Sequence, residues 1–400
     1  MIEKIALTRR GMLTVSGAAA LCLAPGCNAS EPGETSDFSP LWPTRSAPVL
    51  RGATIVQRIR DASIDGEGGA SGHHYLIPHY KLADFEKLAA TGANLVNLSV
   101  PGIWQTEPPY VRDERLVEVL METLEACRSA GLYATIGFRT GPGRSEFIFH
   151  RGSADSWFPA ELIIDDIWRS HDAQMAWGAM CVEAASLIAG RREIAGFTPM
   201  VEPEPEMANI DQAVWREMCW QMAPAIRAAA PELPLLISPP GLGNPTNLGV
   251  MGQPNVGGIV WNVHDYGPFD YTHQARDSRR VKLPGDDADE FASSLGKLKQ
   301  VGGGLPLFMG EFGAVHWAPG REDYWRNRIT ALEAAGINWA AFRWPSSDRD
   351  YEPGDSDFTL GLHGLPPALE ASWKQARLSR QTASAPDRLP GLRPRLSGAD

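Results

Sequence analysis

The sequence is poor in features that several classes of protein require. Only five cysteines occur in 400 residues, and the three that follow Cys27 (Cys127, Cys181 and Cys219) are odd in number. All three fall in helical patterns, so they predict buried thiols rather than a disulfide framework. Basic residues are also scarce relative to acidic ones, and the formal net charge is -11. A nucleic-acid partner is therefore not expected, because contact with a phosphate backbone needs a basic face.

Long hydrophobic runs are absent as well. An uncharged stretch near the N-terminus, from Gly11 to Gly26, is too short and too rich in Ala and Gly for a stable membrane span. It follows Arg9 and Arg10, so residues 1–27 are predicted to be a twin-arginine-type signal peptide. The mature protein is then periplasmic, anchored to the outer membrane or secreted. Cys27 follows a segment that resembles a lipoprotein cleavage box, and both a lipid anchor there and a plain secretory cleavage nearby stay open.

Composition divides the rest of the chain into three parts. Residues 28–47 are rich in Pro, Ser and Glu and predict a flexible linker, whereas residues 376–400 lack apolar periodicity and predict a disordered tail. The whole chain is 43% hydrophobic and 21% charged, which is ordinary for a globular protein with a large core. Residues 48–375 are therefore expected to form one catalytic domain. A monomer is the default expectation for the oligomeric state.

Within this domain, short apolar runs alternate with helical patterns. In the helical patterns, for example 114–131 and 323–336, apolar residues recur at i, i+3, i+4 and i+7 and a Gly follows. The eight apolar runs, separated by these helical patterns, predict parallel strands and the α/β fold of a (β/α)8 TIM barrel. A doubly wound open sheet is the alternative, but no Gly-rich phosphate loop follows the first run. The eight runs are 49–56, 93–100, 132–138, 194–201, 233–239, 257–264, 305–312 and 337–344.

The active site of such a barrel lies at the C-terminal ends of its strands. Glu202 follows the fourth run, and Glu311 lies in the seventh. His264 is the last residue of the sixth run, and Tyr266 comes two residues later. Two carboxylates that face each other across a barrel mouth are what glycoside hydrolysis requires. One donates a proton to the leaving oxygen, and the other attacks the sugar or activates water.

Three of these segments resemble glycoside hydrolase family 5, the cellulase-like retaining β-glycosidases. They are "GFTPMVEP", "WNVHDYGPFDYTHQ" and "LPLFMGEFGA", and they occur in the family's order on its fourth, sixth and seventh strands. The resemblance implies that Glu202 is the general acid/base and Glu311 the nucleophile, with His264 and Tyr266 at the sugar subsite. It further implies hydrolysis of a β-linked glucan- or mannan-type carbohydrate without a cofactor.

The sequence departs from the family pattern at three positions. Val201 stands where the family has Asn before the acid/base, Asn97 where it has Arg, and Arg139 where it has His. Asn97 and Arg139 are still predicted to contact substrate. Arg139 either supports Glu311 in place of the lost arginine or pairs with Glu146. These losses motivate an alternative function, a non-catalytic glycan-binding protein on a degenerate barrel.

Aromatic side chains supply candidate surfaces for stacking sugar rings. Trp104, Trp317 and Trp344 follow the second, seventh and eighth runs, and Trp344 is the preferred platform with Phe342 as its rival. The long segment 139–166 carries four more aromatic residues, which either wall a cleft or pack the loop down. These four are Phe147, Phe149, Trp157 and Phe158.

The remaining polar clusters are predicted to have no catalytic part. Glu204 and Glu206 follow Glu202 closely and are expected to be solvated loop carboxylates. His73, His74 and His79 lie together, but their spacing fits no standard zinc pattern, so no metal is expected. A serine hydrolase is not expected either, since the sequence lacks a nucleophile elbow.

Overall fold

The computed structural model describes residues 40–43, 48–66, 75–276, 288–348, 355–361 and 364–382. The predicted signal peptide, with Cys27, lies outside the described residues, as do His73 and His74. All described residues belong to one compact unit, Asp37–Asp400. Within them, no helix combines the length and the hydropathy that a membrane span requires.

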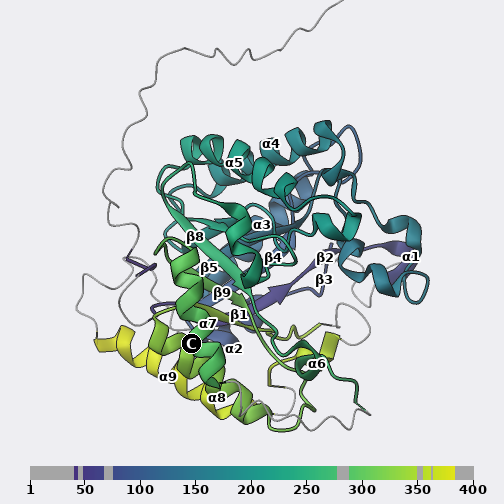
Figure 1. Ribbon diagram of the computed structural model, residues 1–400. Helices are drawn as coiled ribbons and strands as arrows, with labels where there is room; N and C mark the ends of the chain where they lie inside the picture. The colour runs from purple at the N-terminus through teal and green to yellow at the C-terminus, as the bar shows by residue number, and fades with distance from the viewer. Residues whose placement is uncertain are drawn as a thin grey trace, which may run out of the picture. The chain divides into compact units, whose positions relative to one another are not determined.

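Eight parallel strands close into a barrel in the order β1-β10-β9-β8-β7-β6-β5-β4 (Figure 1). Each coincides with one of the eight predicted runs, so the (β/α)8 barrel is confirmed and the open sheet is wrong. Nearly every strand residue is buried because helices cover the outer face and side chains fill the inside, which explains the continuous apolar runs. The strands are β1 (Arg51–Val56), β4 (Leu95–Pro101), β5 (Tyr133–Thr140), β6 (Ile194–Thr198), β7 (Leu235–Ile237), β8 (Ile259–His264), β9 (Leu307–Glu311) and β10 (Asn338–Phe342).

The two helical patterns singled out in the sequence are also confirmed, as α3 and α8. Asp113 caps α3 by accepting hydrogen bonds from the backbone N–H groups of Arg115 and Leu116, and Gly336 ends α8 with a positive φ of 65°. Figure 1 shows α4 and α5 on one side of the strands and α8 and α9 on the other. The α-helices are α1 (Ala62–Asp65), α2 (Leu82–Ala90), α3 (Glu114–Ser129), α4 (His171–Ile188), α5 (Ala213–Ala229), α6 (Phe269–Thr272), α7 (Ala288–Val301), α8 (Arg321–Ala335) and α9 (Pro367–Thr382).

Several shorter elements were not predicted. Strands β2 (Arg58–Ile59) and β3 (Leu76–Ile77) pair antiparallel beside the barrel. Short 3-10 helices occupy the connections between barrel strands and helices. They are η1 (Glu146–Ser153), η2 (Ala160–Leu162), η3 (Asp166–Trp168), η4 (Pro205–Ala208), η5 (Pro245–Met251) and η7 (Asp355–Phe358).

Both predicted boundaries of the domain need correction. Trp42, placed in the flexible linker, is 2% exposed, donates from Nε1 to Ala195 O at 2.8 Å and meets Phe308 edge-on. It belongs to a buried cluster at the N-terminal ends of the strands, so this part of the linker closes the bottom of the barrel. At the other end, α9 continues to Thr382, beyond the expected limit at 375, and it buries Leu369 and Trp373.

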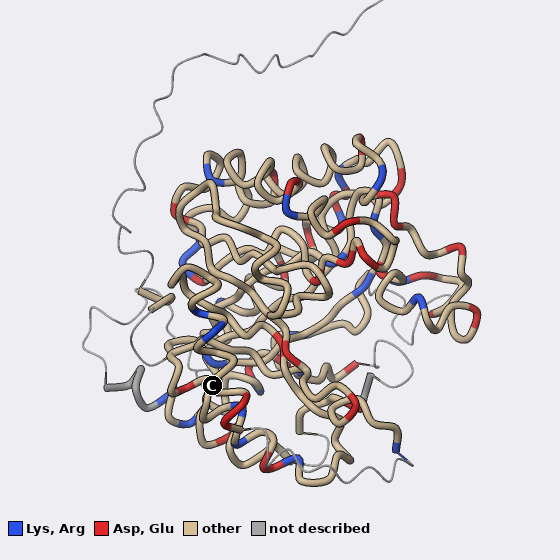
Figure 2. Tube along the Cα trace, viewed as in Figure 1, with Lys and Arg blue, Asp and Glu red and all other residues tan. Residues whose placement is uncertain are grey.

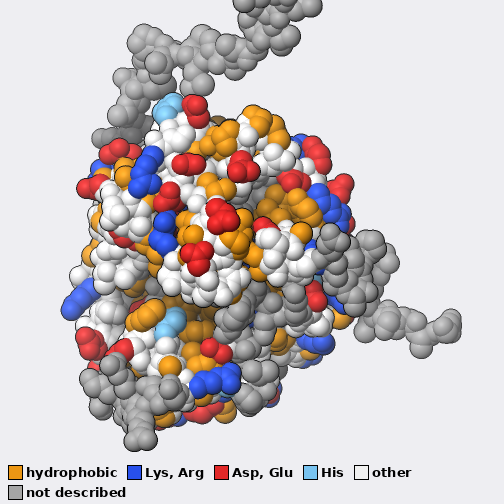
Figure 3. Space-filling model, turned by 90° about the vertical axis from the view of Figure 1, so that its right-hand side faces the viewer, with side chains coloured by type: hydrophobic (Ala, Val, Ile, Leu, Met, Phe, Trp, Pro, Cys, Tyr) orange, Lys and Arg blue, Asp and Glu red, His pale blue; other side chains and the backbone are white. Residues whose placement is uncertain are grey.

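Charged residues of both signs are interspersed around the barrel, as Figure 2 shows along the chain. On the face drawn in Figure 3, acidic, basic and hydrophobic side chains are mixed among the described atoms, without a continuous basic area.

Candidate active site

Glu202, His264 and Glu311 converge at the C-terminal ends of β6, β8 and β9. A carboxylate oxygen of each glutamate and a ring nitrogen of His264 all lie within 4.8 Å of one another. His264 Nδ1 is 2.8 Å from Glu202 Oε1 and 3.5 Å from Glu311 Oε2. His264 and Glu311 are partners in the register of β8 and β9, which explains why a strand-end histidine reaches both carboxylates.

The backbone around Glu202 is held by Arg144, which the sequence patterns did not reveal. Glu202 adopts a left-handed conformation with φ of 50°, which is uncommon for a residue with a side chain. Arg144 is fully buried and donates from Nη2 to the carbonyl oxygen of Glu202 at 2.8 Å and from Nη1 to that of Arg139 at 2.6 Å. Its guanidinium therefore ties the loop after β5 to the loop that presents Glu202.

The expectation that Glu204 is solvated is wrong. Glu204 is 2% exposed, forms an ion pair with Arg144 and accepts a hydrogen bond from Trp168 Nε1 at 2.9 Å. Burial raises the pKa of the Glu204 carboxyl despite this charge pairing. Glu206 is half-buried, and burial raises the pKa of its carboxyl too. Glu204 thus anchors Arg144, and neither Glu204 nor Glu206 is a fully solvated loop carboxylate.

Glu311 is positioned by contacts from three strands. The Tyr266 hydroxyl, two residues beyond β8, donates to Glu311 Oε2 at 2.9 Å. The carbonyl of the preceding Gly310 accepts hydrogen bonds from Thr54 Oγ1 at 2.7 Å and from Asn97 Nδ2 at 3.1 Å. A Cβ on Gly310 would lie 2.2 Å from Asn262 Oδ1, so only glycine lets β9 approach β8 this closely.

The two carboxyls and His264 titrate as a coupled group. Burial raises the pKa of Glu311 to about 7, and the charge of Glu202 adds to this while His264, Arg139 and the Tyr266 hydrogen bond oppose it. Burial acts on Glu202 in the same sense, but the hydrogen bond and charge of His264 outweigh it and lower the pKa of Glu202. Burial alone would lower the pKa of His264, yet the two glutamates raise it. Of the two carboxyls, Glu311 is therefore the one that holds its proton to higher pH.

The same three side chains have the donor set for a divalent metal. Among the described residues they form a group of one imidazole and two carboxylates with metal-like spacing, and zinc accepts this combination. His264 Nδ1 is, however, already hydrogen-bonded to Glu202, and Oε2 of Glu311 accepts from Tyr266. Oε1 of Glu311 and Nε2 of His264 are buried without a hydrogen-bond partner among the described residues, so the direct contacts satisfy the group only in part.

A model of the cellulase family, glycosyl hydrolase family 5, matches residues 66–348. The chain belongs to this family. No curated protein sequence matches the chain. Among solved structures, it is similar to endoglucanase Cel5A from the hyperthermophilic Thermotoga maritima, with 16% identity over 83% of this chain and 96% of that chain and a TM-score of 0.58. It is also similar to the clostridial cellulose synthase subunit Z from Clostridioides difficile, with 14% identity over 82% and 98% and a TM-score of 0.58. At these identities the structural likeness concerns the fold.

Two of the departures from the family-5 pattern have a structural explanation. Val201 is 4% exposed, and its Cγ2 would be 2.4 Å from a Cβ on Gly137, so the valine fills the space above that glycine. Asn97 was predicted to contact substrate, but its amide is engaged inside the barrel. Nδ2 donates to Thr54 and Gly310, and Oδ1 accepts from Thr135. Asn97 therefore positions β9 rather than lining the mouth.

Two roles were predicted for Arg139, support of Glu311 or pairing with Glu146, and its contacts agree in part with each. It is 5% exposed and holds Glu146 through Nε and Nη2, with distances of 2.7 to 3.0 Å. Burial would raise the pKa of Glu146, but the Arg139 charge and hydrogen bonds from His150 and Arg139 lower it to about 2. The positive charge of Arg139 also acts to lower the pKa of Glu202 and of Glu311. Arg139 therefore pairs with Glu146 and contributes to the electrostatic field at Glu202 and Glu311.

The prediction that Trp344 is the platform for a sugar ring is wrong, and the alternative, Phe342, has the suitable position. Trp344 is 7% exposed, donates from Nε1 to Asp84 O at 2.9 Å and packs edge-on against Trp373 of α9. Phe342 is partly exposed and meets Tyr266 edge-on at 6.0 Å. The strand end thus directs Phe342, not Trp344, to the ring that contacts Glu311.

A second aromatic surface near Tyr266 was not predicted. Phe269 is 68% exposed and stacks on His273 with ring centroids 4.0 Å apart, and His273 in turn contacts Tyr266 and Phe358. The family-like segment "HDYGPFDYTHQ" contained the only signal for it.

The other aromatic residues that were predicted to contact substrate interact with groups of the protein itself. Trp104 Nε1 donates to Glu183 Oε2 at 2.7 Å, and Trp317 Nε1 donates to Gln274 O at 2.9 Å. Both rings remain partly exposed, so their contact with substrate stays a prediction. In the segment 139–166, Phe147 and Phe158 are buried and stack at 4.8 Å, which means that these two pack the loop down.

Proposed function

We propose that this family-5 glycoside hydrolase is a retaining β-glycosidase that cleaves a β-linked glucan- or mannan-type carbohydrate. The proposal rests on the approach of Glu202 and Glu311, with oxygens within 4.8 Å of one another. Retaining enzymes hold their carboxyl groups about 5 to 5.5 Å apart, whereas inverting enzymes leave about 6.5 to 9.5 Å for a water. The short separation favours direct attack by one carboxylate.

In this mechanism Glu202 donates a proton to the leaving oxygen as Glu311 attacks the anomeric carbon. A glycosyl ester forms on Glu311, and Glu202, now ionised, takes a proton from water as that water attacks the same carbon and releases Glu311. The pKa of Glu311 is raised and that of Glu202 lowered, so the proton that Glu202 donates must come from Glu311. His264 Nδ1 lies next to both, so it can first give its proton to Glu202 and then accept the proton of Glu311 on the lone pair that this step frees.

The substrate class is supported by the relatives and by the aromatic residues at the mouth. Solved structures of Thermotoga maritima Cel5A similar to this chain are described as complexes with cellobiose and with mannotriose. Phe342 and the exposed Phe269 offer flat apolar faces beside Tyr266, which suits the C–H faces of sugar rings.

The test is hydrolysis of aryl β-glycosides and of β-glucan and mannan oligosaccharides by the wild type, Glu311→Ala and Glu202→Ala. We expect turnover to fall by several orders of magnitude in Glu311→Ala. Azide should restore cleavage of an activated aryl glycoside by Glu202→Ala, because a small anion can replace the activated water and trap a β-glycosyl azide. Glu217→Ala, with an exposed carboxylate on α5, is the matched control. Binding of oligosaccharides by a wild type that turns over nothing would instead support the glycan-binding alternative.

We also propose export, based on Arg9 and Arg10 before the uncharged stretch that ends at Gly26. Replacement of both arginines by lysine should retain the protein in the cytoplasm. Labelling with a lipid precursor, lost in Cys27→Ala, distinguishes a lipid anchor from simple cleavage.

A further inference from the structure

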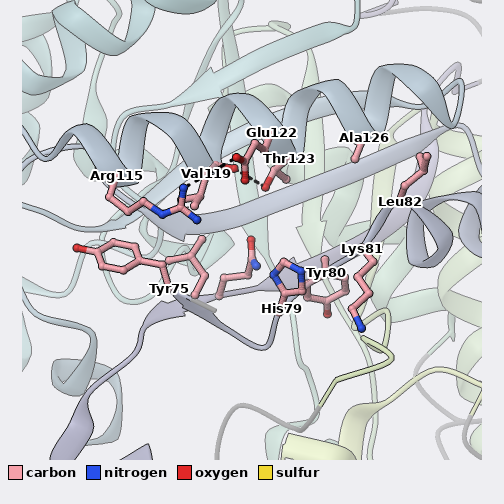
Figure 4. Close-up of a pocket in the computed structure, with 12 residues that line it drawn as sticks. Tyr75, His79, Tyr80, Lys81, Leu82, Arg115, Val119, Glu122, Thr123 and Ala126 are labelled. Carbon is pink, nitrogen blue, oxygen red and sulfur yellow. Dashed lines mark hydrogen bonds and ion pairs between the residues drawn. The ribbon is translucent and has the colours of Figure 1, made fainter. Parts of the chain in front are cut away.

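A cavity of about 240 Å³ lies apart from the catalytic carboxylates, between α3 and the segment that joins β3 to α2. Figure 4 shows the two facing walls. Arg115, Val119 and Thr123 project from α3, and Tyr75 and His79 lie opposite. None of the lining residues belongs to the catalytic centre around Glu202 and Glu311. The volume is below the roughly 300 Å³ at which pockets for drug-sized ligands begin, so the cavity suits a molecule with one ring.

The buried acceptor in this cavity is the side-chain oxygen of Gln57, which follows β1. Gln57 is 2% exposed, and its Nε2 donates to Pro78 O at 2.8 Å, which fixes the orientation of the amide. In the described part of the chain no group donates to Gln57 Oε1. A buried acceptor without a donor is costly. A ligand here must therefore bring a donor such as a hydroxyl, which an ionised carboxylate lacks.

Charges at the walls of the cavity nearly balance. Arg115 lies 3.0 Å from Glu118 and 3.9 Å from Glu122, so its positive charge is already compensated. Lys81 is the other cation of the lining. Such a rim offers donors and acceptors together without a strong field, which favours a neutral polar ligand over an ion.

The remaining lining is apolar or aromatic. Leu76 and Val119 contribute aliphatic surface, and the Tyr75 ring is fixed because its hydroxyl donates to Asp113 Oδ2 at 2.8 Å. A ring with C–H faces and peripheral hydroxyls satisfies both the apolar walls and the polar groups. A simple polyol chain would leave the apolar walls in contact with water.

We propose that this cavity is a second carbohydrate-binding site that takes one neutral sugar residue, either a free monosaccharide or the end of a glycan chain. A hydroxyl of that residue donates to Gln57 Oε1, and its other hydroxyls meet Glu122 and Lys81 at the rim. The proposal concerns binding alone, so it does not depend on hydrolysis at Glu311.

The test uses the full chain with Glu311→Gln, which prevents turnover, and follows backbone amide resonances during titration with methyl β-glucoside and methyl β-mannoside. We expect saturable shifts at Val119 and Thr123 for at least one of the two sugars. Ala126→Phe fills the cavity from α3 without removal of a hydrogen bond and should weaken this binding at least tenfold. Ala225→Phe, at an exposed position of α5, should leave it unchanged.

Further titrations distinguish a sugar site from a polyol or anion site. Gln57→Leu should also weaken binding at least tenfold, and Ala126→Phe keeps the test valid if the leucine variant does not fold. The proposal is overturned if the α3 resonances do not respond to either sugar, or if Ala126→Phe leaves their response intact. Equal affinity for glycerol would indicate an unspecific polyol site, and preference for inorganic phosphate an anion site, and each of these results also overturns it.

Discussion

The hydroxyl of Tyr266 donates to Oε2 of Glu311 at 2.9 Å, and this bond opposes the effect of burial on the carboxyl. It stabilises the ionised form, which is the form that attacks the sugar in the proposed mechanism. A hydrogen bond to a charged group contributes about 1.5 to 3 kcal/mol. Tyr266 therefore favours the ionised form of Glu311, the proposed nucleophile, whereas burial favours the protonated form.

Tyr266→Phe removes this donor and leaves the ring. The pKa of Glu311 should rise, so the acidic limb of the pH profile of kcat/KM should move to higher pH. At the pH optimum, kcat/KM should fall about ten- to hundredfold, as expected from the energy of the lost bond. Tyr324→Phe alters a buried tyrosine of α8 and serves as the control. An unshifted limb in Tyr266→Phe would contradict the assigned role of the bond.

Glu311 should also make stability depend on pH. Its pKa is about 7 in the folded protein and 4.5 as the reference value, so the folded state binds the proton more tightly than the unfolded state. The contribution of Glu311 is complete below about pH 4.5 and is lost as pH rises through 7. Glu311→Gln should therefore be more stable than the wild type above pH 7, by an amount on the order of 3 kcal/mol. The difference should vanish toward pH 4.5.

Urea unfolding at several pH values measures this difference. Glu217→Gln, whose carboxylate on α5 is 72% exposed, provides the baseline for a glutamate outside the site. A constant difference between Glu311→Gln and the wild type from pH 4.5 to 8 would show that the carboxyl does not retain its proton.

Arg144→Lys tests how Glu202 is held. Lysine retains the charge beside Glu204 but not the fork that reaches the carbonyl oxygens of Glu202 and Arg139. We expect kcat to fall at least tenfold with little change in KM, because the proton donor is displaced while the sugar contacts remain. The ion pair is buried, so stability should fall by up to about 3 to 5 kcal/mol.

Arg326→Lys, in an exposed ion pair with Asp323, should change neither kcat nor stability beyond about 1 kcal/mol. Assays well below the melting temperature of each variant separate loss of positioning from loss of fold. An Arg144→Lys variant with reduced stability but normal kcat would assign the arginine to structure alone.

Sequence patterns predicted those parts of the structure that depend on residues close to one another in the sequence. The strands are local apolar runs, and Glu202 and Glu311 stand where such runs end, so the barrel and the pair of carboxylates were predicted. Arg144 could not be found in this way, because Glu202 is 58 positions away in the chain. Trp42 reaches Ala195 over 153 positions, and nothing near Trp42 distinguishes it from a linker residue.

The choice between Phe342 and Trp344 failed for a different reason. Both belong to the same apolar run and point to the same side of an extended strand, which a two-residue period cannot resolve. β10 ends at Phe342, paired with Thr54 of β1, and Trp344 follows in the connection toward α9. The exact end of a strand is set by its neighbours in the barrel rather than by its own sequence.

Phe342→Ala and Trp344→Phe should accordingly have opposite effects. Loss of the Phe342 ring removes apolar contact worth about 1.5 to 3 kcal/mol, so KM should rise about ten- to hundredfold with little loss of stability. Trp344→Phe leaves the carbonyl of Asp84 without its buried donor and creates space beside Trp373, so unfolding should become easier by about 1 to 3 kcal/mol at unchanged KM. Steady-state kinetics and urea unfolding of both variants decide the matter. A raised KM in Trp344→Phe with normal KM in Phe342→Ala would restore the tryptophan as the platform.

Chelation tests whether the cluster of Glu202, His264 and Glu311 works without a metal. Dialysis against EDTA should leave kcat/KM unchanged, because proton donation and nucleophilic attack both come from carboxyl groups. Added Zn²⁺ should inhibit, since an ion bound by the two glutamates and His264 would occupy the oxygens that must react. His264→Asn should weaken that inhibition because it removes the nitrogen ligand, and Glu217→Gln should not. Activity lost on chelation and restored by Zn²⁺ would instead show that the trio holds a working metal ion.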